Sequence, residues 1–277
     1  MSVEIINKAN IAKSFGNAAA TYNDVAHFQR WVGNELLALI PSHQSSNKAP
    51  NIVDLGCGTG YFLSSLQAKY PKANLTGFDL SEDMIRYARQ SHPQQSEHNK
   101  TTWLVGDGES LPFKSGSIDL IFSSLAIQWC GSLSGLLNEI QRVLSDKGVF
   151  VFSSLVDGSL SELKAAWAQV DDDQHVNAFA YISDYQKALA TTELKTELLE
   201  ARTKVLYYKK VKDLTRELKA LGAHNMTSHR PTKLTGKQRV KQFLLAYENF
   251  RQEDGCLPAT YQVLWGVLTK DDIKAQA

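Results

Sequence analysis

The chain has 277 residues, 43% of them hydrophobic, and its formal net charge is +1 at pH 7. This length and composition predict one α/β domain with an added cap and an ample core. The near-zero charge gives no overall drive toward nucleic acid or membrane. No stretch approaches the roughly 18 apolar residues of a membrane span, and no signal-peptide pattern begins the chain, so we expect a cytoplasmic protein.

The three cysteines are scattered along the chain and form no C-x-x-C pair. This spacing supports neither a disulfide framework nor a zinc site. We therefore expect packed or inert thiols at Cys57, Cys130 and Cys256, and no metal cofactor.

The N-terminal segment, residues 9–40, is predicted to be mostly helical and carries several aromatic side chains, among them Phe15, Tyr22, Phe28 and Trp31. Such a segment either closes over a bound ligand as a lid or packs as a helix on the edge of the sheet. Residues 42–50 are polar and are predicted to link this segment to the first strand.

A glycine loop follows the first predicted strand, residues 51–55, and precedes a predicted helix over residues 60–69. Its spacing is G-x-G-x-G, with glycines at Gly56, Gly58 and Gly60 and a carboxylate, Asp54, at the end of the strand. A carboxylate there would repel the pyrophosphate of a dinucleotide. A carboxylate suits the ammonium and sulfonium of S-adenosylmethionine, so the loop predicts this cofactor. The alternative is a tight strand-to-helix turn that binds no ligand, because such turns also contain glycines.

Two further strands end in acidic residues. The strand predicted at 74–79 ends in Asp79, at the separation from the loop where a carboxylate can bind both ribose hydroxyls. The strand predicted at 102–106 precedes Asp107 and Gly108, which are candidates for contacts to adenine. Any one of these acids alone could be a helix cap or a solvated turn residue, but three in register are harder to explain without a ligand.

Three more residues complete the predicted cofactor site: Leu80, Met84 and Ser124. Ser81 is expected to cap a helix at 82–91, and Met84 lies in its first turn, where it either contacts adenine or packs in the core.

The remaining core elements continue the alternation of strands and helices, which predicts a parallel sheet with ligands at the carboxyl ends of its strands. They are strands at 118–123 and 148–155 with a helix at 133–144 between them. The C-terminal part is predicted to add helices near 159–171, 182–190, 211–221 and 235–249, a β segment at 195–209 and a strand near 260–269. The predicted fold class is therefore α/β and Rossmann-like, with a mostly parallel seven-stranded sheet, helices on both faces and a helical cap.

Four segments together resemble class I methyltransferases: VDLGCGTG at 53–60, GFDLS at 77–81, GDGESLPF at 106–113 and IDLIFSS at 118–124. The segment LAIQWC at 125–130, the N-terminal stretch at 11–22 and the segments at 155–163 and 218–224 resemble the malonyl-[acyl-carrier protein] O-methyltransferase family of biotin synthesis. The second resemblance covers nearly the whole chain.

This resemblance implies that S-adenosylmethionine methylates the free carboxyl of a malonyl thioester, carried by acyl-carrier protein or coenzyme A, on the way to pimeloyl and biotin. Two alternatives stay open. One is methylation of a small phenol, quinone or amine, and the other is a cofactor-binding module without catalysis. The implied organisation is a helical lid at 1–48, a cofactor-binding core at 49–157, and cap helices with the remaining strands at 158–277.

An ionised carboxylate is already a nucleophile, so the implied reaction requires no general base. The resemblance places Tyr22 at the methionine end of the cofactor. Gln128 and Trp129 near the sulfonium, and His224 and Arg230 between two cap helices, are candidates for receiving the acceptor. Each has an alternative interpretation. Trp129 could equally be a pocket wall, His224 could be a packed or capping residue, and Arg230 could be a surface charge.

A run of basic residues in the C-terminal part could receive an acidic carrier protein, or it could be an ordinary solvated face. The run consists of Lys204, Lys209, Lys210, Lys212, Arg216 and Lys219. The sequence does not indicate an oligomeric state.

Overall fold

A computed structural model describes residues 7–41, 49–92, 101–223 and 236–271 of the chain. Within these ranges seven strands form one sheet in the order β3-β2-β1-β4-β5-β7-β6. The five that run parallel are β1 (Asn51–Leu55), β2 (Asn74–Asp79), β3 (Thr102–Val105), β4 (Ile118–Ser124) and β5 (Leu144–Leu155). Strand β7 (Leu257–Lys270) is antiparallel to β5, and β6 (Leu194–Tyr208) is antiparallel to β7. The predicted fold class is confirmed.

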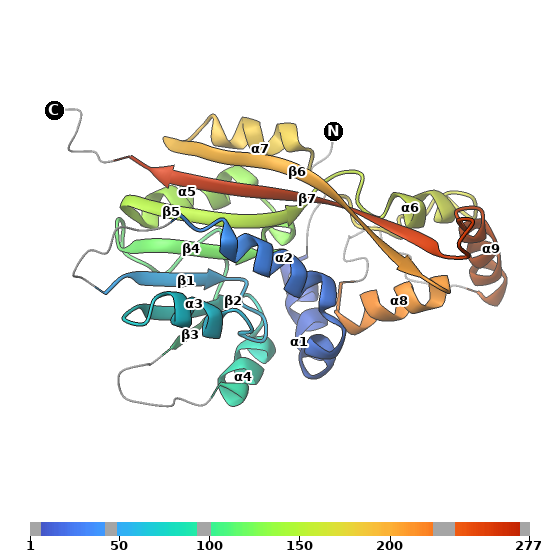
Figure 1. Ribbon diagram of the computed structural model, residues 1–277, viewed down its shortest axis with the longest axis horizontal. Helices are drawn as coiled ribbons and strands as arrows, with labels where there is room; N and C mark the ends of the chain where they lie inside the picture. The colour runs from blue at the N-terminus through green and yellow to red at the C-terminus, as the bar shows by residue number, and fades with distance from the viewer. Residues whose placement is uncertain (1–6, 42–48, 93–100, 224–235, 272–277) are drawn as a thin grey trace.

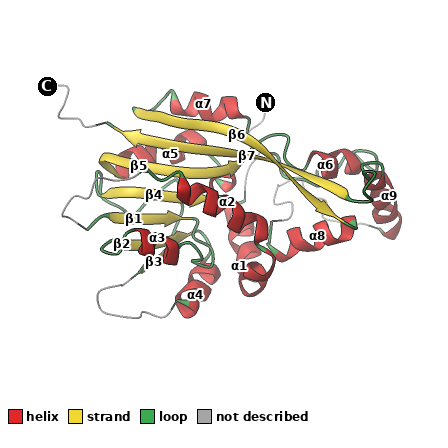
Figure 2. Cartoon of the chain, viewed as in Figure 1, coloured by secondary structure: helices red, strands yellow, loops and turns green. Residues whose placement is uncertain are grey.

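Helices cover both faces of this sheet (Figure 2). One face packs against α2 (His27–Ala38), α3 (Leu63–Lys69) and α4 (Glu82–Ser91), and the other against α5 (Leu133–Val143) and α7 (Ile182–Leu189). Side chains of β4 alternate between the two cores: Phe122 belongs to the first and Ile121 to the second. This period of two, with apolar residues on both faces, is what a buried parallel strand requires.

Strands β6 and β7 extend beyond the other strands, and three helices gather around this extension (Figure 1). They are α6 (Ser161–Trp167), α8 (Val211–Ala220) and α9 (Lys237–Glu248). Phe243 and Tyr247 of α9 and Leu214 of α8 are buried there, in the core that continues from the α2 face of the sheet. The predicted C-terminal helices therefore have a hydrophobic anchor on the extended strands.

The first helix, α1 (Lys8–Val25), lies at the end of the sheet to which the arrow of β1 points (Figure 1). Its middle is joined to the end of α8, where Ser14 Oγ donates to the Gly222 carbonyl at 3.0 Å and Thr21 Oγ1 to the Ala220 carbonyl at 3.3 Å. Among the helices in the described ranges, none combines the length and apolar character needed to cross a membrane.

Two of the predicted helices are clearly shorter in the structure, while the others differ by at most two residues at an end. The helix expected from residue 60 begins at Leu63, because Gly60 has a φ of +78° and the Leu63 N–H closes a turn onto its carbonyl. The helix expected over 159–171 spans only Ser161–Trp167, and it starts late because Leu160 is left-handed, with a φ of 55°. Left-handed backbone cannot continue an α-helix.

Candidate active site

A large cavity lies at the carboxyl ends of β1, β2, β3 and β4 and encloses about 800 Å³ of empty space, part of it open to solvent. Its walls are one side of α1, the glycine loop, the ends of β2 and β3, and the segment 124–130 except for Gln128. This position, at the carboxyl ends of parallel strands, is typical of ligand sites in α/β sheets. The predicted site residues that line it are Tyr22, Gly56, Gly58, Asp79, Leu80, Met84, Asp107, Gly108, Ser124 and Trp129.

The glycine loop forms the floor of this cavity. Gly58 has a φ of +52°, and a Cβ at this position would meet no atom within 4 Å, so its backbone faces open space. Gly56, with a φ of +75°, has no room for a side chain because a Cβ would collide with Ala126. Gly60 does not line the cavity; a Cβ there would lie 2.7 Å from the ring of Trp103, so this glycine serves the packing of the loop on β3.

Asp79, at the end of β2, holds the glycine loop in place. Its Oδ2 accepts from the Gly58 N–H and its Oδ1 from the Ser81 N–H, each at 2.8 Å. Burial raises the pKa of the Asp79 carboxyl, although these backbone hydrogen bonds and one from Leu80 act against the shift. Because the two carboxylate oxygens have about four lone pairs and the three backbone N–H groups use three of them, the side chain can accept one further hydrogen bond from a ligand.

Asp54, at the end of β1, is buried, with a side-chain oxygen (Oδ2) that has no hydrogen-bond partner in the described chain. Burial, and then the charge of Asp79, raise the pKa of this carboxyl to about 8. Asp54 lines a second, smaller chamber that also contains Arg30, Tyr61 and Tyr22; we call it the Asp54 chamber. A buried carboxylate without a partner is costly, and a cationic ligand would relieve that cost.

Arg30 was not predicted as a site residue. Its guanidinium lies 5.7 Å from the centre of the Tyr61 ring and contacts His27 Nδ1 at 2.8 Å, and it also donates to the Asn23 carbonyl. A positive charge in the same chamber as the buried Asp54 makes the chamber suited to a ligand group carrying both charges, such as the head of an amino acid.

Asp107, after β3, is paired with Lys8, another residue that the sequence did not single out. Lys8 Nζ lies 2.6 Å from Asp107 Oδ2 and 2.5 Å from Glu109 Oε1. The other oxygen of Asp107 accepts from the Glu109 N–H at 3.0 Å. The acid predicted to contact adenine therefore also joins the start of α1 to the core.

A third chamber adjoins the large cavity and is lined mostly by aromatic and aliphatic side chains; we call it the aromatic chamber. The two share Phe15, Tyr22, Leu125 and Trp129 as a common wall, in which the rings of Phe15 and Trp129 meet edge to face with centroids 5.3 Å apart. Tyr22 lines all three chambers. Tyr22 is half-buried, and the desolvation of its hydroxyl together with the charge of Asp79 raises its pKa, so it remains protonated at neutral pH.

Gln128 lines only the aromatic chamber, and its carboxamide is already bonded. Its Nε2 donates to the Leu125 carbonyl at 2.7 Å, and its Oε1 accepts from Ser154 Oγ at 3.3 Å. The residue that it supports, Leu125, has a φ of 51° directly after β4. A left-handed leucine is strained, and such strain is typical of functional turns. His224 and Arg230, the other predicted acceptor residues, lie outside the described residues.

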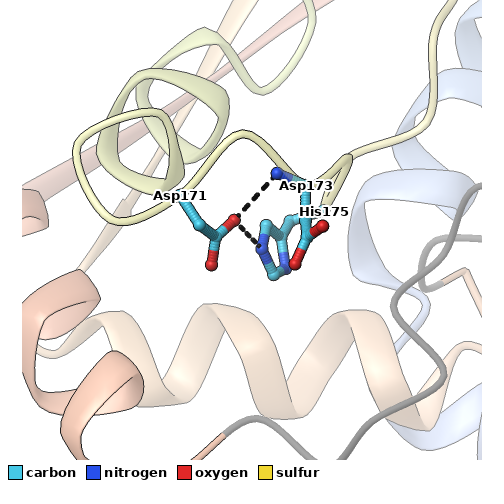
Figure 3. Close-up of side chains that lie close together, drawn as sticks. All are labelled: Asp171, Asp173 and His175. Carbon is cyan, nitrogen blue, oxygen red and sulfur yellow. Dashed lines mark hydrogen bonds and ion pairs between the residues drawn. The ribbon is translucent and has the colours of Figure 1, made fainter.

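A group of metal-ligating side chains lies in the loop after α6 and lines none of the three chambers (Figure 3). Ligand atoms of Asp171, Asp173 and His175 lie within 4.8 Å of one another. The guanidinium of Arg239 already contacts both carboxylates, Asp171 at 3.2 Å and Asp173 at 3.4 Å. Figure 3 draws the bonds that His175 and the Asp173 N–H make to Asp171. We interpret the group as an ion network that holds this loop to α9.

Comparison with known proteins gives the family. A model of the methyltransferase domain family matches residues 53–152. The malonyl-[acyl-carrier protein] O-methyltransferase of Hahella chejuensis is 39% identical over 259 residues, which cover 93% of this chain and 89% of that protein. The protein of the same name from Pectobacterium atrosepticum is 36% identical over 98% of this chain and all of that protein. The chain belongs to the malonyl-[acyl-carrier protein] O-methyltransferase family.

This membership confirms the family predicted from the sequence and does not favour the two alternatives. The biotin biosynthesis bifunctional protein BioHC of Cellvibrio japonicus is 42% identical over 265 residues, but this chain spans only about half, 51%, of its length.

Solved structures support the fold. The YcgJ protein from Bacillus subtilis has a TM-score of 0.58 at 19% identity, covering 87% of this chain and 98% of that one. The geranyl diphosphate C-methyltransferase from Streptomyces coelicolor has a TM-score of 0.53 at 16% identity, covering 90% and 83%, and its structure contains S-adenosyl-L-homocysteine and Mg²⁺. At this identity the similarity concerns the fold alone.

Proposed function

We propose that the protein transfers a methyl group from S-adenosylmethionine to the free carboxyl of a malonyl thioester, giving the methyl ester and S-adenosylhomocysteine. The family membership supports this reaction. The observation in the structure that carries it is the aromatic chamber: among its described lining residues there is no lysine, arginine, histidine, aspartate or glutamate. Such a chamber suits an acceptor that arrives already ionised.

The residues of the large cavity and the Asp54 chamber fit the cofactor. Asp54 has an unpartnered buried oxygen for a cationic group, and Arg30 in the same chamber is suited to a carboxylate. Asp79 has a lone pair left for a ribose hydroxyl, and Gly58 leaves open space where a side chain would otherwise stand. When bound, S-adenosylmethionine supplies a methyl group on a positively charged sulfur.

The acceptor then determines whether the protein must move a proton. A carboxylate has a pKa near 4 and is ionised at neutral pH, whereas a phenol or an ammonium must first lose a proton to a base. Tyr22 is kept protonated by burial and can donate a hydrogen bond but cannot accept the proton of a phenol at neutral pH. The described residues therefore favour a carboxylate over the phenol or amine alternatives.

The shared wall determines where the two reactants meet. The large cavity and the aromatic chamber share one wall, formed by Phe15, Tyr22, Leu125 and Trp129. A methyl group in the cavity and a carboxylate oxygen in the aromatic chamber would be separated only at this wall. Aromatic side chains exclude water from the junction, which raises the reactivity of opposite charges that combine to neutral products. The alignment of the two reactants lowers the barrier further.

We further propose that the thioester is presented by acyl-carrier protein and that α8 receives the carrier. Leu218 and Leu221 at the end of α8 line the aromatic chamber. The exposed side chains of Lys212 and Lys219 lie on the same helix, and Lys209 and Lys210 directly precede it. Ten residues of helix span about 15 Å. An acidic partner on these lysines would thus lie within the length of a helix from the chamber, close enough for a flexible acyl arm.

The test is methyl transfer from labelled S-adenosylmethionine to a panel of acceptors. The proposal predicts label in malonyl-carrier protein, released by mild base as expected of a methyl ester. Label in phenols, quinones or amines with none in the malonyl thioester would support the alternative function instead.

A further inference from the structure

The side chain of Gln29 stands between two chambers. It lies in the first turn of α2 and lines both the aromatic chamber and the Asp54 chamber. Its Oε1 is buried, and the described chain gives it no hydrogen-bond partner. A buried amide oxygen without a partner destabilises the folded protein, so its retention at a chamber wall points to a ligand.

The surroundings of Gln29 indicate the chemistry of that ligand. Gln128, another side-chain amide of the aromatic chamber, is bonded at both ends, to Leu125 and Ser154. A carboxamide offers two N–H donors and one acceptor, and a rotation of 180° exchanges their positions. Gln29 can therefore present its N–H groups to an anion in a chamber whose described walls carry no cationic side chain.

We infer that Gln29 is a catalytic residue that binds the acceptor carboxylate through its Nε2 and directs the second carboxylate oxygen toward the methyl group. This inference rests on the proposed function, because it takes the acceptor to be the malonyl carboxylate. Tyr22, which lines the same junction as a protonated phenol, is the second donor.

A neutral hydrogen-bond donor suits this methyl transfer better than a cationic one. An arginine would bind the carboxylate in a bidentate ion pair and stabilise the charge that must be lost on methylation. Neutral donors such as the Gln29 amide and the Tyr22 hydroxyl orient the group while leaving most of that charge on the attacking oxygen. The Gln29 amide discriminates against substrates without an anionic oxygen. An amine substrate would leave the N–H groups of Gln29 without a carboxylate oxygen to donate to.

The experiment compares Gln29→Met, which keeps the length of the side chain without a donor, and Gln29→Glu, which places a like charge beside the acceptor. Gln242→Met and Gln242→Glu are matched controls, because this glutamine is exposed on α9 outside the chambers. Steady-state kinetics with malonyl-carrier protein, thermal unfolding, and calorimetric affinity for S-adenosylhomocysteine are measured for all five proteins including wild type.

Loss of one hydrogen bond to a charged group corresponds to a fall in kcat/KM of about 10- to 100-fold for Gln29→Met. The kcat/KM of Gln29→Glu should fall further. Both Gln29 variants should keep the wild-type affinity for S-adenosylhomocysteine, and the Gln242 controls should keep both values. A Gln29→Met protein that folds and keeps wild-type kcat/KM would overturn the inference while the proposed function stands. Equal losses in kcat/KM and in S-adenosylhomocysteine affinity would also overturn it, because Gln29 would then serve the cofactor. If wild type does not methylate the malonyl thioester at all, the proposed function itself fails.

Discussion

Lys8 joins the first turn of α1 to the segment after β3, with its Nζ 2.6 Å from Asp107 Oδ2 and 2.5 Å from Glu109 Oε1. Burial would lower the pKa of the Lys8 ammonium, but its hydrogen bonds to the two carboxylates and their charges raise it overall. Lys8 also lines the large cavity. The helix that forms one wall of the cavity is therefore tied down at the end nearest the proposed adenine site.

Lys8→Met should let the start of α1 open more often. Because Lys8 and Asp107 are each about one-third exposed, at 31% and 36%, we expect a loss of about 1 kcal/mol for the two ion pairs together. Stopped-flow displacement should show S-adenosylhomocysteine dissociating about fivefold faster, and less dependent on salt, than from wild type. The control is Lys13→Met, an exposed lysine of the same helix, which should dissociate at the wild-type rate. Equal rates for the two variants would contradict the role of the Lys8 tie.

Asp79→Asn should weaken cofactor binding. The variant keeps the shape of the side chain but replaces a charged acceptor by a neutral amide facing the Gly58 and Ser81 N–H groups and the ribose. Hydrogen bonds to charged groups contribute about 1.5–3 kcal/mol each, so the dissociation constant for S-adenosylhomocysteine should rise at least about tenfold by calorimetry. Unchanged affinity would refute the ribose assignment.

Asp54 predicts a pH dependence of stability in the ligand-free protein. Its folded pKa of about 8 lies above the roughly 3.9 of an unfolded aspartate, so the folded state keeps a proton that the unfolded state loses. This contribution to stability is complete below about pH 4 and is lost as pH rises through about 8, by ~6 kcal/mol as an upper bound.

Asp54→Asn removes this titration and keeps the volume of the side chain. Urea unfolding between about pH 5 and 9 should show that the ligand-free variant loses less stability than wild type with rising pH. The same variant should bind S-adenosylmethionine more weakly, because the partner of its cationic group is gone. Parallel stability curves for the two proteins would mean that Asp54 is ionised across the whole range.

Charge reversal tests the carrier surface. Changing Lys209, Lys210 and Lys212 together to Glu should lower kcat/KM for malonyl-carrier protein at least about tenfold, and for malonyl-coenzyme A much less. The matched control changes three exposed lysines away from α8, namely Lys72, Lys114 and Lys187, to Glu. If the first triple variant slows both acceptors equally, α8 does not receive the carrier.

The strands and their acidic ends were predictable because a parallel sheet aligns the ends of neighbouring strands. Asp54 pairs in register with Gly77, and Asp79 with Val105, so the carboxylates meet at one edge. Lys8, Gln29 and Arg30 were not predictable in this way. They reach the site from helices far away in sequence, through side chains whose direction depends on how α1 and α2 dock.

The glycine loop shows the same limit in a single motif. The G-x-G-x-G pattern predicts a turn with left-handed residues, and Gly56, Gly58 and Gly60 all have positive φ. The pattern does not say which glycine meets a ligand. Only the packing of Trp103 against Gly60 and the open space beside Gly58 distinguish them.

The most direct test of the account is the pH dependence of methyl transfer in a single turnover, with S-adenosylmethionine bound in advance and a saturating malonyl thioester. A carboxylate acceptor that needs no protein base predicts a rate constant that stays level between about pH 6 and 9. A rate that rises with pH and levels off above an inflection near 6.5, as a histidine base would cause, would contradict it.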